Sequence, residues 1–127
     1  MAQGTSYPGG LAEARASRVA KSPSPYRDFH AIEYSLSSKL AIYYIGGEVL
    51  VGNQGIEAVL NYHVPQGVNP KILMLDLCLI QRPGVWPAVE TWVSAKYISL
   101  GKPGQYTDVQ VLGGPLGDFT IKVLPLP

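Results

Sequence analysis

Apolar and polar residues alternate along most of the chain from residue 29 onward. Residues 32–37 read IEYSLS, and the same period of two returns in residues 40–44. It is seen again in three later segments, which are TWVSAKYISL (91–100), YTDVQVL (106–112) and DFTIKVLPL (118–126). A period of two is typical of a β-strand with one face toward a core. We therefore predict a sheet of six or seven strands, which begins with one long bent strand or a pair.

Two segments depart from this alternation. Residues 54–64, QGIEAVLNYHV, place four residues at helical intervals ahead of a closing proline, namely Ile56, Val59, Leu60 and His63. This spacing predicts one core helix. Residues 71–81, KILMLDLCLIQ, are apolar at almost every position. Such a run is typical of a central strand that is covered on both faces.

Glycine and proline separate the predicted strands. Gly46-Gly47 is interpreted as a turn before a short strand at 48–51, and the segments at 82–90, 101–105 and 113–117 are interpreted as loops or turns. Strands bounded by such turns favour an antiparallel sheet. The predicted fold class is therefore α+β, a largely antiparallel sheet with one core helix on one face. The alternative is an all-β sandwich, which requires residues 54–64 to be non-helical.

The first 28 residues differ in composition from the rest. Glycines and prolines interrupt them, and the helix-forming run LAEARASRVAK (11–21) is too short to be stable alone in water. The chain of 127 residues is 46% hydrophobic and 15% charged, which suffices for one modest core. We predict a flexible, mildly basic arm over residues 1–28, followed by a single β-rich globular domain over residues 29–127.

Positive charge is concentrated in this arm. The arm carries four cations against two anions, whereas residues 29–127 carry six against seven, and the net charge of the chain is +1. So small a net charge argues against a dedicated nucleic-acid binder. The predicted contacts with an anionic membrane surface or a nucleoprotein are the four cations of the arm, which are Arg15, Arg18, Lys21 and Arg27.

The sequence also suggests a cellular location. The single cysteine, Cys78, excludes an intrachain disulfide and is expected to be a buried free thiol. The N-terminus lacks the apolar stretch of a secretory signal, and the longest apolar runs, about ten residues, are too short to span a bilayer. We expect an intracellular, cytoplasmic protein whose contact with a membrane is peripheral.

Residues that could carry catalysis are few. His30 and His63 lie on different predicted elements, while Asp76 and Cys78 point to the same face of a predicted central strand, away from any loop. The sequence contains no zinc-finger spacing, no acidic calcium loop and no G-x-x-x-x-G-K-[ST] phosphate loop. We therefore predict that the protein is not an enzyme and has neither a metal site nor a cofactor.

Asp76 is unusual because an ionised carboxylate is costly to bury unless it is paired. One interpretation is a hydrogen-bonded polar residue at a bulge, a turn edge or an interface. The other is a salt bridge to a specific partner.

The aromatic residues favour a binding role. Eight tyrosines and two tryptophans exceed what so small a core needs, and the adjacent Tyr43 and Tyr44 must point to opposite sides of a strand. Val85 and Trp86 form an apolar loop segment that we predict to be an exposed anchor for a partner or a membrane surface. The alternative is that Trp86 folds back onto the core. Tyr43, Tyr44 and Asp76 are further candidates for an interface.

Four segments follow one another over about residues 30–92: IYYIGGEVLV, the predicted helix IEAVLNYH, the apolar run KILMLDLCLI and the loop that contains Trp86. This order resembles that of the matrix proteins of rhabdoviruses, which are small α+β proteins with a mobile basic N-terminal tail. The resemblance implies self-association under a membrane, nucleocapsid binding and promotion of budding. By position, the cations of the arm match the membrane-binding tail, and Val85 and Trp86 match the apolar loop. The segment SPSPYR departs from the P-P-x-Y motif of many members.

We therefore expect a non-enzymatic structural protein, similar to a viral matrix protein, that self-associates and peripherally engages a membrane or a nucleoprotein. The alternative is a small intracellular β-domain that binds a protein or glycan ligand through Tyr43 or Tyr44 and Trp86.

Overall fold

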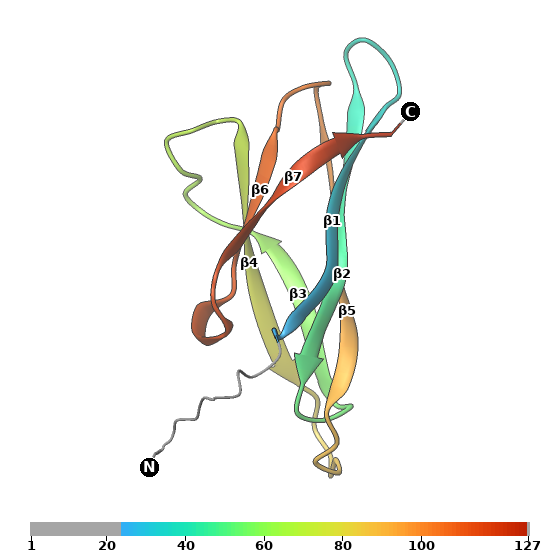
Figure 1. Cartoon of the computed structure of the whole chain (residues 1–127), viewed down its shortest axis with the longest axis vertical. Coiled ribbons are helices and arrows are strands. Elements are labelled where there is room, and N and C mark those ends of the chain that lie inside the picture. Colours follow the sequence, from blue (N-terminus) through green and yellow to red (C-terminus); the bar gives the residue numbers. More distant parts are fainter. Residues whose placement is uncertain (1–23, 127) are drawn as a thin grey trace.

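The computed structural model describes residues 24–126, and almost all of its regular structure is β-strand (Figure 1). Seven strands follow one another, with one short 3-10 turn, η1, before the last of them. Their bounds are β1 Tyr26–Ser35, β2 Ala41–Val51, β3 Ile56–Tyr62, β4 Ile72–Gln81, β5 Thr91–Gly101, β6 Asp108–Leu112, η1 Gly114–Leu116 and β7 Phe119–Pro125.

The strands form one sheet in the order β3-β4-β6-β7-β1-β2-β5. The β4–β6 and β1–β7 pairs are parallel, and the other four pairs are antiparallel. The two outermost strands, β3 and β5, also lie against each other. The sheet is therefore rolled into a nearly closed barrel.

The core fills the inside of this barrel. Alternate side chains of each strand point inward, and those that are fully buried include Ile45 and Val49 of β2, Leu73 and Leu75 of β4, and Val109 of β6. Burying one such side chain contributes about 1.5–3 kcal/mol to folding. The period of two that predicted strands thus corresponds to the inside and outside of the barrel.

The predicted core helix is wrong, and with it the α+β class. Residues 56–62 form strand β3, which pairs antiparallel with β4, and the described residues are 59% strand and 3% helical. The segment also alternates, because Ile56, Ala58 and Leu60 contact the core while Glu57 and Asn61 are exposed. Seven residues fit both periods, and pairing with β4 decides between them. The non-helical segment meets the condition set for the all-β alternative, although the strands form one rolled sheet.

Two further expectations about the strands are corrected. Strand β4 is covered on one face only: Leu73, Leu75 and Leu77 are buried, whereas Cys78 on the outer face is exposed. Gly46-Gly47 is not a turn, because β2 runs straight through it. The ring of Tyr44 lies over Gly46 and the ring of Phe29 over Gly47, so each glycine gives room to an aromatic neighbour.

The first described strand begins inside the segment that we assigned to the arm. Strand β1 starts at Tyr26, so Arg27 and Asp28 are part of the sheet. Asp28 has a φ of 59° at an irregularity between Arg27 and His30, where the pairing with β2 shifts register. The Tyr26 hydroxyl donates a hydrogen bond to the Gly117 carbonyl at 2.6 Å. This bond joins the start of β1 to the β6–β7 connection.

We predict that Gly47→Ala destabilises the barrel. A Cβ at residue 47 would lie 2.3 Å from the Phe29 ring, which is itself packed among core residues. Overpacking of this kind costs about 1–3 kcal/mol of the free energy of unfolding. Chemical denaturation of the two proteins measures the change. Gly52→Ala is the control, because nothing lies within 4 Å of the added Cβ there. Equal stability of the Gly47→Ala protein and the wild type would contradict the packing described.

Candidate functional site

The cations of the arm are only partly described. Arg15, Arg18 and Lys21 lie outside the described residues. Arg27 is placed on the outside of the barrel, where its Nε lies 2.6 Å from Glu48 Oε1 and its guanidinium stacks 4.1 Å from the centre of the Trp92 ring. Its charge is therefore already partnered, unlike that of a free cation awaiting an anionic surface.

The apolar loop differs from the predicted exposed anchor in one of its two residues. Val85 is fully exposed, but Trp86 is half-buried and folds back over Gly55, so close that a Cβ there would lie 2.3 Å from the ring. The Trp86 indole N–H donates to the Arg82 carbonyl at 3.0 Å, and the Arg82 guanidinium lies 5.0 Å from the ring centre. Trp86 thus fixes the shape of the loop, and of these two residues Val85 is the one presented to solvent.

Tyr43 and Tyr44 point to opposite sides of β2. Tyr43 is buried, and its hydroxyl donates to the Lys102 carbonyl at 2.6 Å and accepts from the Gln105 N–H at 3.0 Å. It therefore holds the β5–β6 connection and has no surface for a partner. Tyr44 lies on the outside, with its ring centre 5.7 Å from that of His30.

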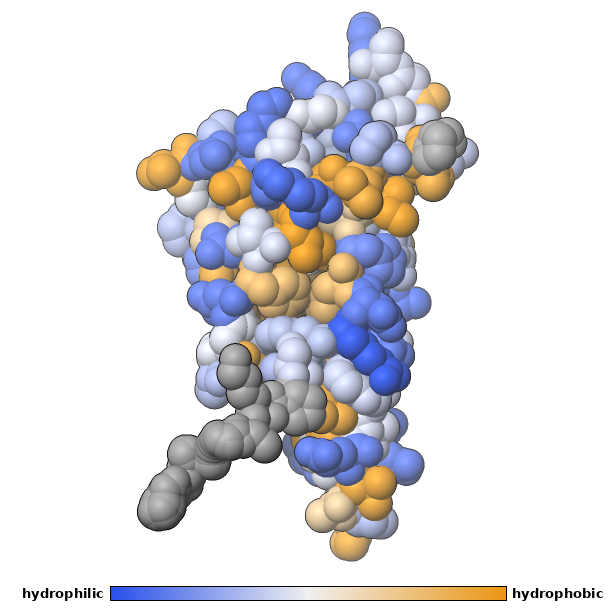
Figure 2. Space-filling model, viewed as in Figure 1, coloured by the Kyte–Doolittle hydropathy of each residue, from blue (hydrophilic) through white to orange (hydrophobic). Residues whose placement is uncertain are grey.

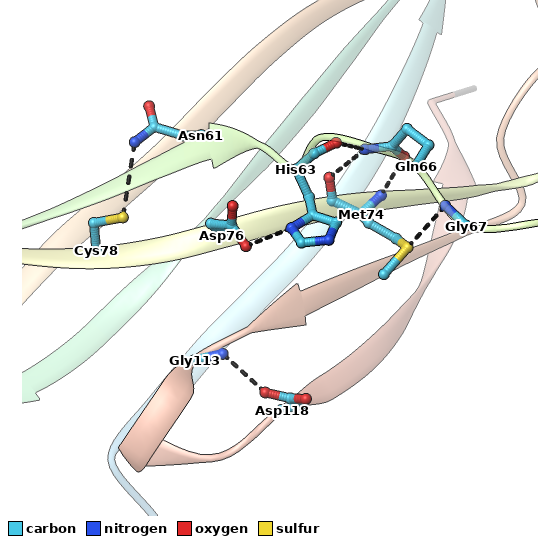
Figure 3. Close-up of polar contacts among 9 residues, drawn as sticks. All are labelled: Asn61, His63, Gln66, Gly67, Met74, Asp76, Cys78, Gly113 and Asp118. Atoms are coloured by element: carbon cyan, nitrogen blue, oxygen red, sulfur yellow. Dashed lines mark hydrogen bonds and ion pairs between the residues drawn. The ribbon is translucent and has the colours of Figure 1, made fainter.

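Asp76 is paired within the chain, on the outer face of β4 (Figure 3). Its Oδ1 lies 2.8 Å from Nδ1 of His63, just beyond the end of β3, and the Asp76 side chain is 40% exposed. The apolar run therefore does not bury this carboxylate. His63, which the sequence placed on the predicted core helix, instead follows the end of β3, where Asp76 orients it.

The same view explains why these residues make no nucleophilic triad. Cys78 and His63 lie on either side of Asp76, and the Cys78 thiol contacts the Asn61 amide at 3.9 Å (Figure 3). A triad requires the histidine between the nucleophile and the carboxylate. Among the described residues there is also no group of three side chains suited to hold a metal ion.

Gln66 is the centre of a polar network in the β3–β4 loop. Its amide nitrogen donates to the carbonyls of His63 at 2.6 Å and Met74 at 2.9 Å, and its oxygen accepts from the Met74 N–H at 2.8 Å. Beyond the end of β3, the Gln66 side chain thereby makes the hydrogen bonds to β4 that a paired strand would make. Lys71 ties this loop to the β5–β6 connection, since its ammonium donates to the Gly104 carbonyl at 2.7 Å.

These two connections lie at the upper end of the barrel in Figure 1. They line an open pocket of about 240 Å³. We call it the tyrosine pocket. Its lining consists of two tyrosines, two glutamines and three residues of small or aliphatic side chains: Tyr62, Tyr106, Gln66, Gln105, Gly67, Pro70 and Ile72. Burial and the nearby Tyr62 hydroxyl raise the pKa of Tyr106. Tyr62 itself is 47% exposed.

Among the described residues, the outer surface of the barrel carries an exposed apolar area, which we call the apolar face. One row crosses four neighbouring strands in register, and a second row beside it crosses three; they are Leu124, Ile32, Tyr44 and Ile98, and then Tyr34, Ile42 and Leu100. Ile98, Leu100 and Leu124 are each more than 60% exposed. Figure 2 shows hydrophobic residues on the upper half of the barrel, over β7 and the strands beside it.

Below the apolar face the outer surface becomes polar. His30 and Lys96 occupy the next register positions, and a shallow hollow there is lined by Asp28, Glu48 and Ser94 as well. On β7 the equivalent neighbour is Lys122, whose ammonium lies 2.9 Å from Asp108; hydrogen bonds from Lys122 and Thr107 lower the pKa of that carboxyl. The apolar face therefore has a defined polar border.

Comparison of the chain with protein-family models, with curated proteins and with solved structures gives no match in any of the three. The resemblance to rhabdovirus matrix proteins stays a prediction. Within residues 24–126 no helix is long and apolar enough to cross a membrane.

Sequence reasoning missed both the apolar face and the tyrosine pocket. Part of the face could be predicted, because the outward positions of residues 32–34, 42–44 and 98–100 are apolar in the sequence. Only the register shows that they adjoin. The pocket gathers residues from two separate segments, 62–72 and 105–106, and nothing in the local pattern links them.

We predict that Gln66→Ala loosens the β3–β4 loop. The substitution leaves the part-buried Met74 N–H without its acceptor, which costs about 1–3 kcal/mol in local stability. Hydrogen exchange of the Met74 amide should become faster. Gln54→Ala, at an exposed position between β2 and β3, is the control and should leave that exchange rate unchanged. Unchanged Met74 exchange in the Gln66→Ala protein would contradict the proposed bracing.

Proposed function

We propose that this protein is a structural building block that associates with further copies of itself through the apolar face. The observation that carries the proposal is the pair of apolar rows that crosses β7, β1, β2 and β5 in register. Monomeric proteins rarely expose contiguous apolar area beyond a few hundred Å², and larger areas mark sites of association.

The exposure of the apolar side chains on this face favours an interface between copies. Ile98, Leu100 and Leu124 are 61–65% exposed, and Tyr34 is 49% exposed. The neighbouring Leu36 and Leu40 are 51% and 40% exposed, so exposed apolar side chains continue from the face to the β1–β2 turn. Two such β-sheet faces can stack with their side chains interdigitated, at about 10 Å between sheets.

The closure of the sheet also favours this mode of association. Exposed edge strands recruit other chains by backbone hydrogen bonds. Here the two outermost strands, β3 and β5, lie against each other, so their edges are poorly accessible to a strand of another chain. The outer face of the sheet remains accessible for association. Contact of the arm with a membrane or a nucleoprotein is a separate prediction, which depends on Arg15, Arg18 and Lys21 rather than on Arg27.

We predict that Leu100→Lys shifts the protein toward monomers. A lysine at this 65% exposed position would have to be desolvated in a stacked interface, while the monomer tolerates it. Sedimentation velocity over a range of concentrations measures the association of the full chain. We expect at least about a tenfold rise in the dissociation constant, equivalent to about 1.4 kcal/mol.

Ile80→Lys is the matched control, because Ile80 is an outward isoleucine of β4 that is 50% exposed and lies outside the apolar face. It should associate like the wild type. A wild-type chain that stays monomeric at high concentration would overturn the proposal, as would equal association of the Leu100→Lys protein. Binding of monomers to vesicles of neutral or anionic lipid that is lost in Leu100→Lys would instead assign the face to a membrane.

A further inference from the structure

We infer that the tyrosine pocket is a binding site for a neutral sugar residue, presented as a free sugar or as one unit of a glycan. The inference concerns a different part of the barrel from the apolar face and does not depend on self-association. It is based on the chemistry of the lining, the size of the cavity and the bracing of its walls.

The lining combines apolar rings with uncharged hydrogen-bonding groups. Tyr62, Tyr106 and Ile72 supply apolar walls, while the amides of Gln66 and Gln105 and the tyrosine hydroxyls supply polar ones. A sugar ring has the same division, since its C–H face packs on aromatic rings and its edge carries hydroxyls. A purely aliphatic ligand would leave polar groups of the lining, such as the tyrosine hydroxyls, desolvated without new partners, which costs about 1–3 kcal/mol each.

The charge of the pocket lining limits which class of ligand can bind. The described lining contains no aspartate, glutamate, lysine, arginine or histidine. A phosphate, carboxylate or ammonium group would therefore lose its hydration without gaining an opposite charge. The pocket thus selects an uncharged ligand.

The volume sets the size of the ligand. The cavity of about 240 Å³ lies below the about 300–1,000 Å³ of sites for drug-sized molecules. It accommodates one ring and its substituents. A proline-rich peptide needs an extended groove for several residues, so we favour a single sugar residue.

The walls are held in place before any ligand arrives. Three hydrogen bonds fix the Gln66 amide, and Gln105 accepts from the Lys102 N–H at 2.8 Å while its own N–H donates to Tyr43. The Lys71–Gly104 bond spans the two connections. Preformed walls reduce the entropy cost of binding. In contrast, the Tyr62 ring remains 47% exposed and is free to stack.

Titration of the ¹⁵N-labelled full chain tests the inference by two-dimensional NMR. The probes are glucose, galactose, mannose and N-acetylglucosamine, each to about 50 mM, since millimolar binding corresponds to about −4 kcal/mol. Glucuronic acid and glucosamine are the charged comparators, and a proline-rich peptide is the competing ligand. We expect at least one neutral sugar to shift the amide signals of Tyr62, Gly67, Gln105 and Tyr106, and the charged comparators to bind more weakly.

Two substitutions at residue 62 separate stacking from hydrogen bonding. Tyr62→Ala should weaken sugar binding about tenfold through loss of the ring, whereas Tyr62→Phe keeps the ring and should weaken it less. Tyr34→Ala is the matched control, because Tyr34 is 49% exposed and lies on the apolar face. The dispersed spectrum of each variant verifies that it is folded. The inference fails if none of the sugars shifts the pocket signals, if Tyr62→Ala binds like the wild type, or if only the peptide binds.

Discussion

Strand β7 joins the two halves of the barrel, and the remaining structure depends on its hydrogen bonds. Residues 123–125 pair in parallel with β1, and residues 119–122 pair antiparallel with β6. On one side of β7 lie β1, β2 and β5, and on the other lie β6, β4 and β3. The closing contact of β3 with β5 has no ladder of its own. The two halves therefore enclose a common core because β7 makes the hydrogen bonds at the edge of each half.

The sequence predicted the strands better than their arrangement. Alternation at residues 91–100, 106–112 and 118–126 corresponds to β5, β6 and β7. Residues 54–64 misled because seven residues fit helical and strand periods alike, and a long-range partner decides the outcome. Gly46-Gly47 misled for a different reason. Glycine interrupts strands as turns do, but here it makes room for Phe29 and Tyr44, which local sequence cannot reveal.

The candidate sites were less predictable than the fold. Individual residues such as Tyr44 were recognised, yet the apolar face exists only through the register of four strands. Trp86 appeared to be an anchor because its neighbours are glycine and proline; in the structure the space over Gly55 holds its ring. The tyrosine pocket needs contacts between the β3–β4 loop and the β5–β6 connection. Such contacts connect residues more than thirty positions apart, beyond any local pattern.

The alternation of inward and outward side chains separates two kinds of constraint within a single strand. In β2 the buried Ile45 and Val49 must fit a fixed volume, whereas the intervening outward positions meet solvent or a partner. Substitutions at Ile42 or Tyr44 therefore change the chemistry of the outer surface while the interior keeps its packing. In evolutionary terms, the barrel can acquire or lose a partner through a few outward residues, and its inward residues conserve the scaffold.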